Sequence, residues 1–187
     1  MQSDQQPDQQ PPTDPESEVP EADPESVART ILLDALTGRA RSRSELADLL
    51  ARKNVPEEIG ERLLDRFTEV GLVDDAQFAH AWVQGRQQAK GLARRALAQE
   101  LRRKGVDDEV AREALDTLEP DEEEAAARRL VQRKLRSLRG VDDQAAIRRL
   151  AGMLARRGYP SSLTFRVVRE ELAAAGRDSE GLDEPTL

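Results

Sequence analysis

A pattern that occurs three times limits what this chain of 187 residues can fold into more than any other feature. In each copy a leucine is followed four residues later by a second leucine, and then by two basic residues. The copies are 51 and 53 residues apart, as shown by the first leucines Leu46, Leu97 and Leu150. Repeats of this length are typical of arrays of small helical units, because one unit alone buries too little apolar surface to be stable.

A turn follows the basic pair in every copy. The first residue after the pair is small and tolerates a left-handed backbone, which favours the end of a helix. These residues are Asn54, Gly105 and Gly158. An apolar position follows five residues later at Ile59, Val110 and Leu163, which begins the stripe of another helix. Each copy therefore predicts two helices joined by a tight turn.

A further helix precedes this pair in every copy. Val27 and Ile31 have helical spacing, and we match them to Phe78 and Trp82 and then to Val131 and Leu135. No stretch has the alternation of a strand. We predict an all-α fold of three tandem three-helix repeats, at 26–73, 74–119 and 120–174, that form an elongated, curved helical-repeat body. The acidic flanks, 1–25 and 175–187, are expected to be disordered because they carry few residues for a core.

Composition and charge exclude several classes of protein. The chain has no cysteine and one histidine, which excludes thiolate metal sites and histidine clusters. Its beginning resembles no signal peptide and no apolar run is long enough to span a membrane, so we expect a cytoplasmic protein. No heptad seam argues for a coiled-coil dimer, and we expect a monomer. The net charge of −8 is concentrated in the flanks. Residues 26–172 hold 28 basic and 25 acidic residues, so this body is slightly basic.

No set of residues predicts catalysis. His80 has no partner for acid–base work, and a packing or surface role is the simpler interpretation. Asp74 and Asp75 stand directly before an apolar helical stripe, where a carboxylate caps a helix. The acids of 122–124 suit the first turn of a helix better than a metal site. With no glycine-rich phosphate loop, we predict no enzyme, no cofactor, no metal and no small-molecule substrate.

Basic residues are the strongest candidates for binding. Arginine and lysine neutralise phosphates or grip acidic protein surfaces, although a solvated helix face is the alternative for each residue. Glu100 is the only acid in the first cluster. The candidate residues are Arg86, Lys90, Arg94, Arg95, Arg102, Arg103 and Lys104 in the second copy, and Arg128, Arg129, Arg133 and Lys134 in the third. Arg148, Arg149, Arg156 and Arg157 continue the pattern.

The aromatic residues of the second copy have two interpretations. Phe78 and Trp82 lie four residues apart on one helix face, which favours a place in the core. A stacking platform for nucleic-acid bases is the second possibility.

The second copy resembles the signature block of the RecX family of bacterial RecA regulators. The motif runs GLVDDAQFAHAWVQGR, then KG, then LAQELRRKGV, from Gly71 to Val106, and the similarity extends over about 26–172. The acidic segment before residue 26 falls outside it. The resemblance implies tandem three-helix repeats without an active site of their own.

The same resemblance implies a partner, the RecA–DNA filament. A family member is expected to bind along the filament and to lower recombinase, ATPase and co-protease activities, and so to modulate DNA repair and the SOS response. Contact with single- or double-stranded DNA is expected to be weak or to occur through RecA, because the acidic flank opposes it. The alternative is a module that binds single-stranded DNA or RNA directly.

Overall fold

The computed structural model describes residues 23–177, and this part of the chain folds into nine α-helices and one short 3₁₀ helix, without a strand. Unit 1 comprises α1 (Pro24–Gly38), α2 (Arg43–Arg52) and α3 (Glu57–Glu69). Unit 2 comprises α4 (Asp75–Lys90), α5 (Arg94–Arg103) and α6 (Asp108–Asp116). Unit 3 comprises α7 (Pro120–Leu135), the 3₁₀ helix η1 (Arg136–Leu138), α8 (Asp143–Arg156) and α9 (Ser161–Ala174). The predicted all-α fold of three-helix repeats is confirmed.

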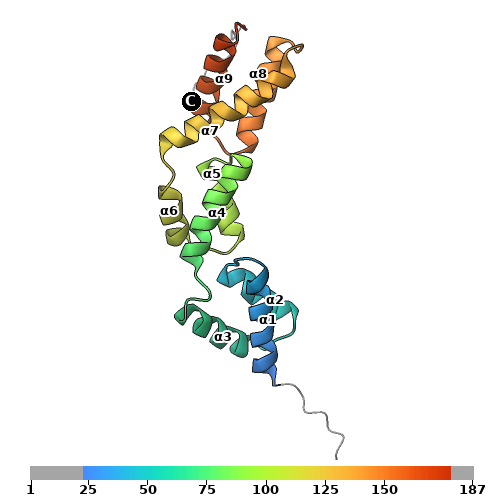
Figure 1. Ribbon diagram of the computed structural model, residues 1–187, viewed down its shortest axis with the longest axis vertical. Helices are drawn as coiled ribbons and strands as arrows, with labels where there is room; N and C mark the ends of the chain where they lie inside the picture. Colours follow the sequence, from blue (N-terminus) through green and yellow to red (C-terminus); the bar gives the residue numbers. More distant parts are fainter. Residues whose placement is uncertain (1–22, 178–187) are drawn as a thin grey trace, which may run out of the picture.

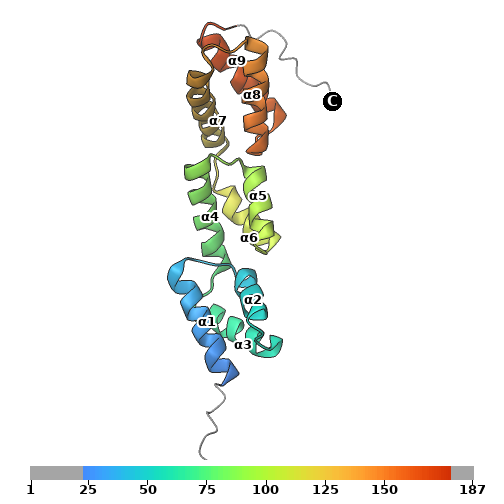
Figure 2. The ribbon, with the colours of Figure 1, turned by 90° about the vertical axis from the view of Figure 1, so that its right-hand side faces the viewer.

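The three units are stacked one after another along the long axis of the molecule (Figures 1 and 2). The helices in extensive contact with each other belong to the same unit. Each unit has its own buried core, represented by Leu46 and Leu50 in unit 1, Leu97 and Leu101 in unit 2, and Leu150 and Leu154 in unit 3. The repeated leucines therefore bury three small cores. None of the described helices is long and apolar enough to cross a membrane.

The helices begin where the sequence supplies a cap. Ser42 and Glu45 form a capping box at α2, in which the Ser42 hydroxyl accepts from the Glu45 amide and the Glu45 carboxylate accepts from the Ser42 amide. The carboxylates of Asp74, Asp107 and Asp142 cap α4, α6 and α8 by accepting from a backbone amide of the first turn. Asn54, Gly105 and Gly158 all have positive φ, as the repeat predicted.

The ordered body is longer than the expected 26–174. Helix α1 begins at Pro24, and the Asp23 carboxylate accepts from the amides of its first turn. At the other end Arg177 is held by the carbonyl oxygens of Leu138 and Val141 and by Asp143. The rest of the two flanks predicted to be disordered lies outside the described residues.

The matching of the first helices is wrong in the third copy. Burial pairs Ala28 and Leu32 of α1 with Ala79 and Val83 of α4, and then with Ala127 and Val131 of α7. Val131 is therefore a core residue, but it lies 48 residues after Val83, and Leu135 ends the helix. The reason is that η1 and an extra first turn of α8 add residues between the two helices of unit 3. Val27, assigned to the stripe of α1, is 41% exposed.

Neighbouring units are joined end to end by polar contacts. At the first junction the Ser42 hydroxyl donates to the carbonyl oxygen of Lys104 at 2.5 Å, and the Arg43 amide donates to Asp75 Oδ1 at 2.8 Å. The turn of unit 2 containing Gly105 thereby rests on the start of α2, with Ser44 directly against the glycine.

The second junction repeats this arrangement one unit further along. The Ala93 amide donates to the carbonyl oxygen of Arg157 at 2.9 Å, and the Arg94 amide donates to Glu123 Oε1 at 2.9 Å. Gly158 packs against Ala96 at the start of α5. The two junctions therefore share one geometry, in which the glycine turn of a unit docks on the start of the second helix of the unit before it.

Candidate functional site

The aromatic residues of unit 2 are enclosed by charged side chains. Phe78 is buried and stacks on Trp82 with ring centroids 5.6 Å apart. The Arg86 guanidinium and the Lys104 ammonium lie 4.3 and 4.8 Å from the centre of the Trp82 ring, as cation–π contacts. The indole Nε1 donates to Glu100 Oε2 at 2.8 Å. These contacts use Trp82 for packing, which favours the core interpretation over a platform for bases.

The two cations over Trp82 are also bound by carboxylates. Arg86 Nε lies 2.9 Å from Glu100 Oε2, and Lys104 Nζ lies 2.5 Å from Glu45 Oε1 of unit 1. Partial burial opposes ionisation of Glu45, but Lys104 and the Ser42 amide outweigh it and hold the pKa of Glu45 below its ordinary value. Both predicted binding residues therefore stabilise the fold, Arg86 within unit 2 and Lys104 at the first junction.

Two further arginines of the predicted cluster are engaged by α6. Arg94 donates to the Leu115 carbonyl oxygen and pairs with Asp116, and Arg102 pairs with Asp108 at 3.1 Å. Glu100 is the only acid within the stretch 86–104, but the fold brings Glu45, Asp108 and Asp116 to it from other helices. The exposed cations of this set without an ion pair in the described part of the chain are Lys90, Arg95 and Arg103.

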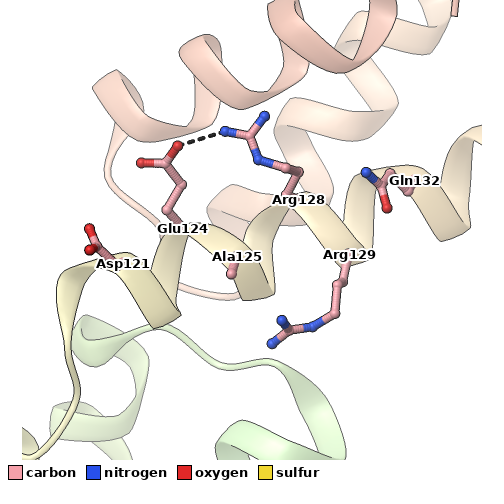
Figure 3. Close-up of a pocket in the computed structure, with 6 residues that line it drawn as sticks. All are labelled: Asp121, Glu124, Ala125, Arg128, Arg129 and Gln132. Atoms are coloured by element: carbon pink, nitrogen blue, oxygen red, sulfur yellow. Dashed lines mark hydrogen bonds and ion pairs between the residues drawn. The ribbon is translucent and has the colours of Figure 1, made fainter. Parts of the chain in front are cut away.

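The predicted binding residues of α7 also include both ion-paired and exposed cations. Arg128 pairs with Glu124 of its own helix at 2.7 Å (Figure 3). It also pairs with Glu170 of α9 at 2.8 Å. The hydrogen bonds that Arg128 donates to Glu170 and Glu124 raise the pKa of Arg128, and the bond from Arg128 lowers the pKa of Glu124. Arg129 extends from another side of α7, and both residues line a shallow hollow of about 450 Å³. Arg133 and Lys134 are exposed.

A second hollow, of about 750 Å³, has a different electrostatic character. We call it the basic pocket, and its lining consists of Lys134, Ala145, Arg148, Arg149, Met153, Arg156 and Arg157. Five of these seven residues are cationic and none is acidic. Arg148, Arg149 and Arg156 are exposed and have no carboxylate partner in the described part of the chain. The pocket therefore presents uncompensated positive charge.

One cation of the basic pocket is fixed by the fold. Arg157 Nε donates to the Lys90 carbonyl oxygen at 3.1 Å, so the pocket adjoins the second junction. Nearby, the Tyr159 hydroxyl donates to the Gly91 carbonyl oxygen, and burial raises the pKa of Tyr159 to about 12. A pocket of this kind can bind successive phosphates of a polyanion, since each arginine offers several donors.

Only Lys134 of the pocket is among the eleven candidate residues chosen from the sequence. The four arginines of α8 and its turn were noted only as a continuation of the pattern. The available signal was the repetition of an Arg–Arg pair eight residues later, at 148–149 and 156–157. A spacing of eight advances a helix by about 80° beyond two full turns, so the pairs share a broad face.

The adjacent acids Asp74 and Asp75 cap a helix and join two units, respectively. Asp74 caps α4 through the Gln77 amide at 2.8 Å, whereas Asp75 accepts from the Arg43 amide of unit 1. Burial raises the pKa of Asp75, and the Arg43 amide opposes this rise. Within residues 23–177 no group of acids and histidine is placed to hold a metal ion.

Three family models match the chain, one for each unit. They describe the first, second and third three-helix domains of RecX, and they match residues 28–67, 74–115 and 121–168. Two solved structures have the same fold. One is a crystal structure of regulatory protein RecX, with a TM-score of 0.70 and 23% identity, matched over 80% of this chain and 73% of that one. The other is the crystal structure of RecX from Lactobacillus salivarius, with a TM-score of 0.72 and 18% identity, matched over 82% of this chain and 99% of that one.

Several curated proteins are similar over most of their length. Regulatory protein RecX of Thermobifida fusca is 55% identical over 149 residues, which cover 80% of each chain. Regulatory protein RecX of Streptomyces coelicolor is 51% identical over 155 residues, 83% of this chain and 82% of that one. The Mycobacterium marinum protein of the same name is 51% identical over 148 residues, 79% and 86% of the two chains.

Proposed function

The chain belongs to the RecX family, and we propose on this basis that it is a regulator of the RecA recombinase. In this proposal the protein acts in the cytoplasm, binds along the RecA–DNA filament and lowers its recombinase, ATPase and co-protease activities. The observation that carries the proposal is the match of all three units to RecX domains, in a body that stacks them end to end.

The shape and charge of the molecule support this mode of action. Three units in a row offer a long and narrow surface, which suits contact with several subunits of a polymer. The basic pocket of unit 3 supplies a place for the phosphates of filament DNA, whereas the more strongly paired cations of unit 2 favour a structural role. We therefore assign the polyanion contact to unit 3, with the exposed Lys90, Arg95 and Arg103 as additional contacts.

The DNA-dependent ATPase of RecA tests the proposal. We expect stoichiometric amounts of the protein to lower ATP turnover severalfold on single-stranded DNA. An R148Q/R149Q/R156Q variant should inhibit less, because three exposed cations of the pocket are lost. The matched control R52Q/K53Q/R66Q removes three exposed charges from unit 1 and should inhibit like the unchanged protein. Full ATPase activity in the presence of the unchanged protein would refute the proposal.

Direct binding of a single nucleic-acid strand is the second candidate function, and the basic pocket favours it. Five cations without an acid in one lining are the arrangement expected for a backbone site. Fluorescence anisotropy of a labelled oligothymidylate would measure this binding. If four phosphates are neutralised, the logarithm of affinity should fall with the logarithm of salt concentration with a slope of about −3. Absence of binding at low salt excludes this function and leaves RecA regulation open.

A further inference from the structure

We propose that residues 178–187 are an autoinhibitory segment that occupies the basic pocket until a nucleic acid displaces it. This inference rests on the proposed function in one respect, namely that the pocket takes phosphates. The inference goes further, because it makes a segment of the same chain the regulator of that pocket. Three observations carry it: the position of Arg177, the length of the segment and the distribution of charge.

Arg177 fixes the point from which the segment departs. Its side chain is only 17% exposed and its Nε lies 2.6 Å from Asp143 Oδ1, in the first turn of α8. The same guanidinium donates to the carbonyl oxygens of Leu138 at 3.0 Å and Val141 at 2.5 Å. Gly176, with a φ of +66°, turns the chain into this position. Arg177, the last described residue, therefore lies beside the helix that supplies most of the basic pocket.

The segment is long enough to reach the pocket and to run along it. A helix rises 1.5 Å per residue, so Arg156 lies about 20 Å along α8 from Asp143. Ten residues in an extended conformation span at most about 33–36 Å. Because Ile147 and Leu150 face the core on the side of α8 opposite to the pocket, the segment has to pass around the start of the helix. The remaining length covers the distance from Ala145 to Arg156.

The charges of segment and pocket are complementary. Residues 178–187 have the sequence DSEGLDEPTL, with four acids and no base. The pocket has five bases and no acid, and Arg148, Arg149 and Arg156 have no carboxylate partner in the described part of the chain. A short tether gives the segment an effective concentration in the millimolar range, so a weak site suffices for occupancy. A polyanion must then compete with the segment for the same cations.

Anisotropy titrations with a labelled oligothymidylate compare three forms of the protein. They are the unchanged chain, a chain that ends at Arg177, and the full-length variant D178N/E180Q/D183N/E184Q. We expect the two altered forms to bind about fivefold more tightly, because the tethered competitor is removed or neutralised. The chain that ends at Arg177 retains the anchoring contacts of this residue with Leu138, Val141 and Asp143. The difference should shrink at high salt, where both interactions are screened.

A matched control separates occupancy of the pocket from net charge. The variant D4N/D8N/D14N/E16Q neutralises the same number of acids near the other end of the chain, and it should tighten binding much less than the neutralised 178–187 segment does. Adding R148Q/R149Q/R156Q should weaken binding and abolish the difference between the neutralised and unchanged segments. Equal tightening by both sets of neutral substitutions would overturn the inference, because net charge would then explain the effect.

The remaining outcomes distinguish this inference from the proposed function. If neutralising residues 178–187 leaves affinity unchanged while the pocket variant still weakens binding, the autoinhibition is wrong and the pocket remains a phosphate site. If the pocket variant binds as tightly as the unchanged chain, the pocket and its inhibition both fail. Regulation of RecA is measured separately, as the inhibition of its ATPase by the chain that ends at Arg177.

Discussion

At the scale of single residues, two turns need glycine because of their neighbours as well as their backbone. Gly158 has a φ of +89°, which strains any residue with a Cβ. A Cβ at this position would lie 2.7 Å from the Ala96 amide nitrogen, which belongs to the unit before it. Gly105 is in the same situation against Ser44. The sequence predicted the left-handed turn, but the contact between units required knowledge of the fold.

Replacing three glycines of unit 3 by alanine separates these effects. We expect Gly158→Ala to destabilise the protein by about 3 kcal/mol, because backbone strain adds to a collision with main-chain atoms. Gly176→Ala keeps the positive φ but meets open space, and should lose about 1 kcal/mol. Gly140→Ala has neither problem and serves as the control. Urea unfolding measures all three, and equal losses at 158 and 176 would contradict the docking role of Gly158.

Tyr159 predicts a loss of stability at alkaline pH. The side chain is 2% exposed, and burial raises its pKa to about 12, so the folded state favours the neutral phenol. This contribution is complete below the ordinary pKa of about 10 and is lost as the pH rises from there towards 12, by about 2–3 kcal/mol. Tyr159→Phe should unfold more readily at pH 8, since the bond to Gly91 is missing. Its stability should fall less steeply between pH 10 and 12 in urea titrations, and parallel curves would refute this role.

At the scale of helices, the first junction depends on a cation that touches three elements. Lys104, at the end of α5, pairs with Glu45 of α2 and lies over Trp82 of α4. We expect Lys104→Met to destabilise the protein by about 1–2 kcal/mol, because Glu45 then loses its partner in a partly buried site. Trp82 is the only tryptophan, so its emission reports the change. Lys90→Met, at the exposed end of α4, is the control, and an equal effect would show that Lys104 has no special role.

The same junction is sensitive to acid. The pKa of Glu45 is lower in the folded protein than its ordinary value. Its ionised form therefore stabilises the fold above the ordinary pKa, and this contribution is lost as the pH falls through the lower, folded value. We expect a change in Trp82 emission in this acid range, which Glu45→Gln should remove. Persistence of the transition in the glutamine variant would assign it to another carboxylate.

Helical spacing was sufficient to predict the class and order of these elements. Leucines four residues apart and left-handed turn residues are local signals, and they located the second and third helices of each unit. The register of α7 was beyond this method, because η1 and the longer α8 shift the first helix against the pair that follows. Val27 shows the complementary error: an apolar residue at helical spacing is exposed when no neighbouring helix covers it.

At the scale of the whole molecule, charge along the sequence is a poor guide to free charge on the surface. The stretch from Arg86 to Lys104 has one acid in the sequence, yet in the fold four of its cations have carboxylate partners. Two of these partners come from α6 and one from unit 1, which no local pattern reveals. The basic pocket keeps its charge because no acid lines the hollow formed by α7, α8 and the following turn.

The junction between units also sets the number of units that the chain can stack. Unit 1 provides only the receiving half, at Ser42–Ser44, since its own turn carries Asn54 and the glycine position has no room for a Cβ. Unit 3 provides the docking half at Gly158, and Arg177 occupies the region beside the start of α8. Unit 2 carries both halves. The middle unit is therefore a self-compatible module, and duplicating it in register would lengthen the rod by one unit.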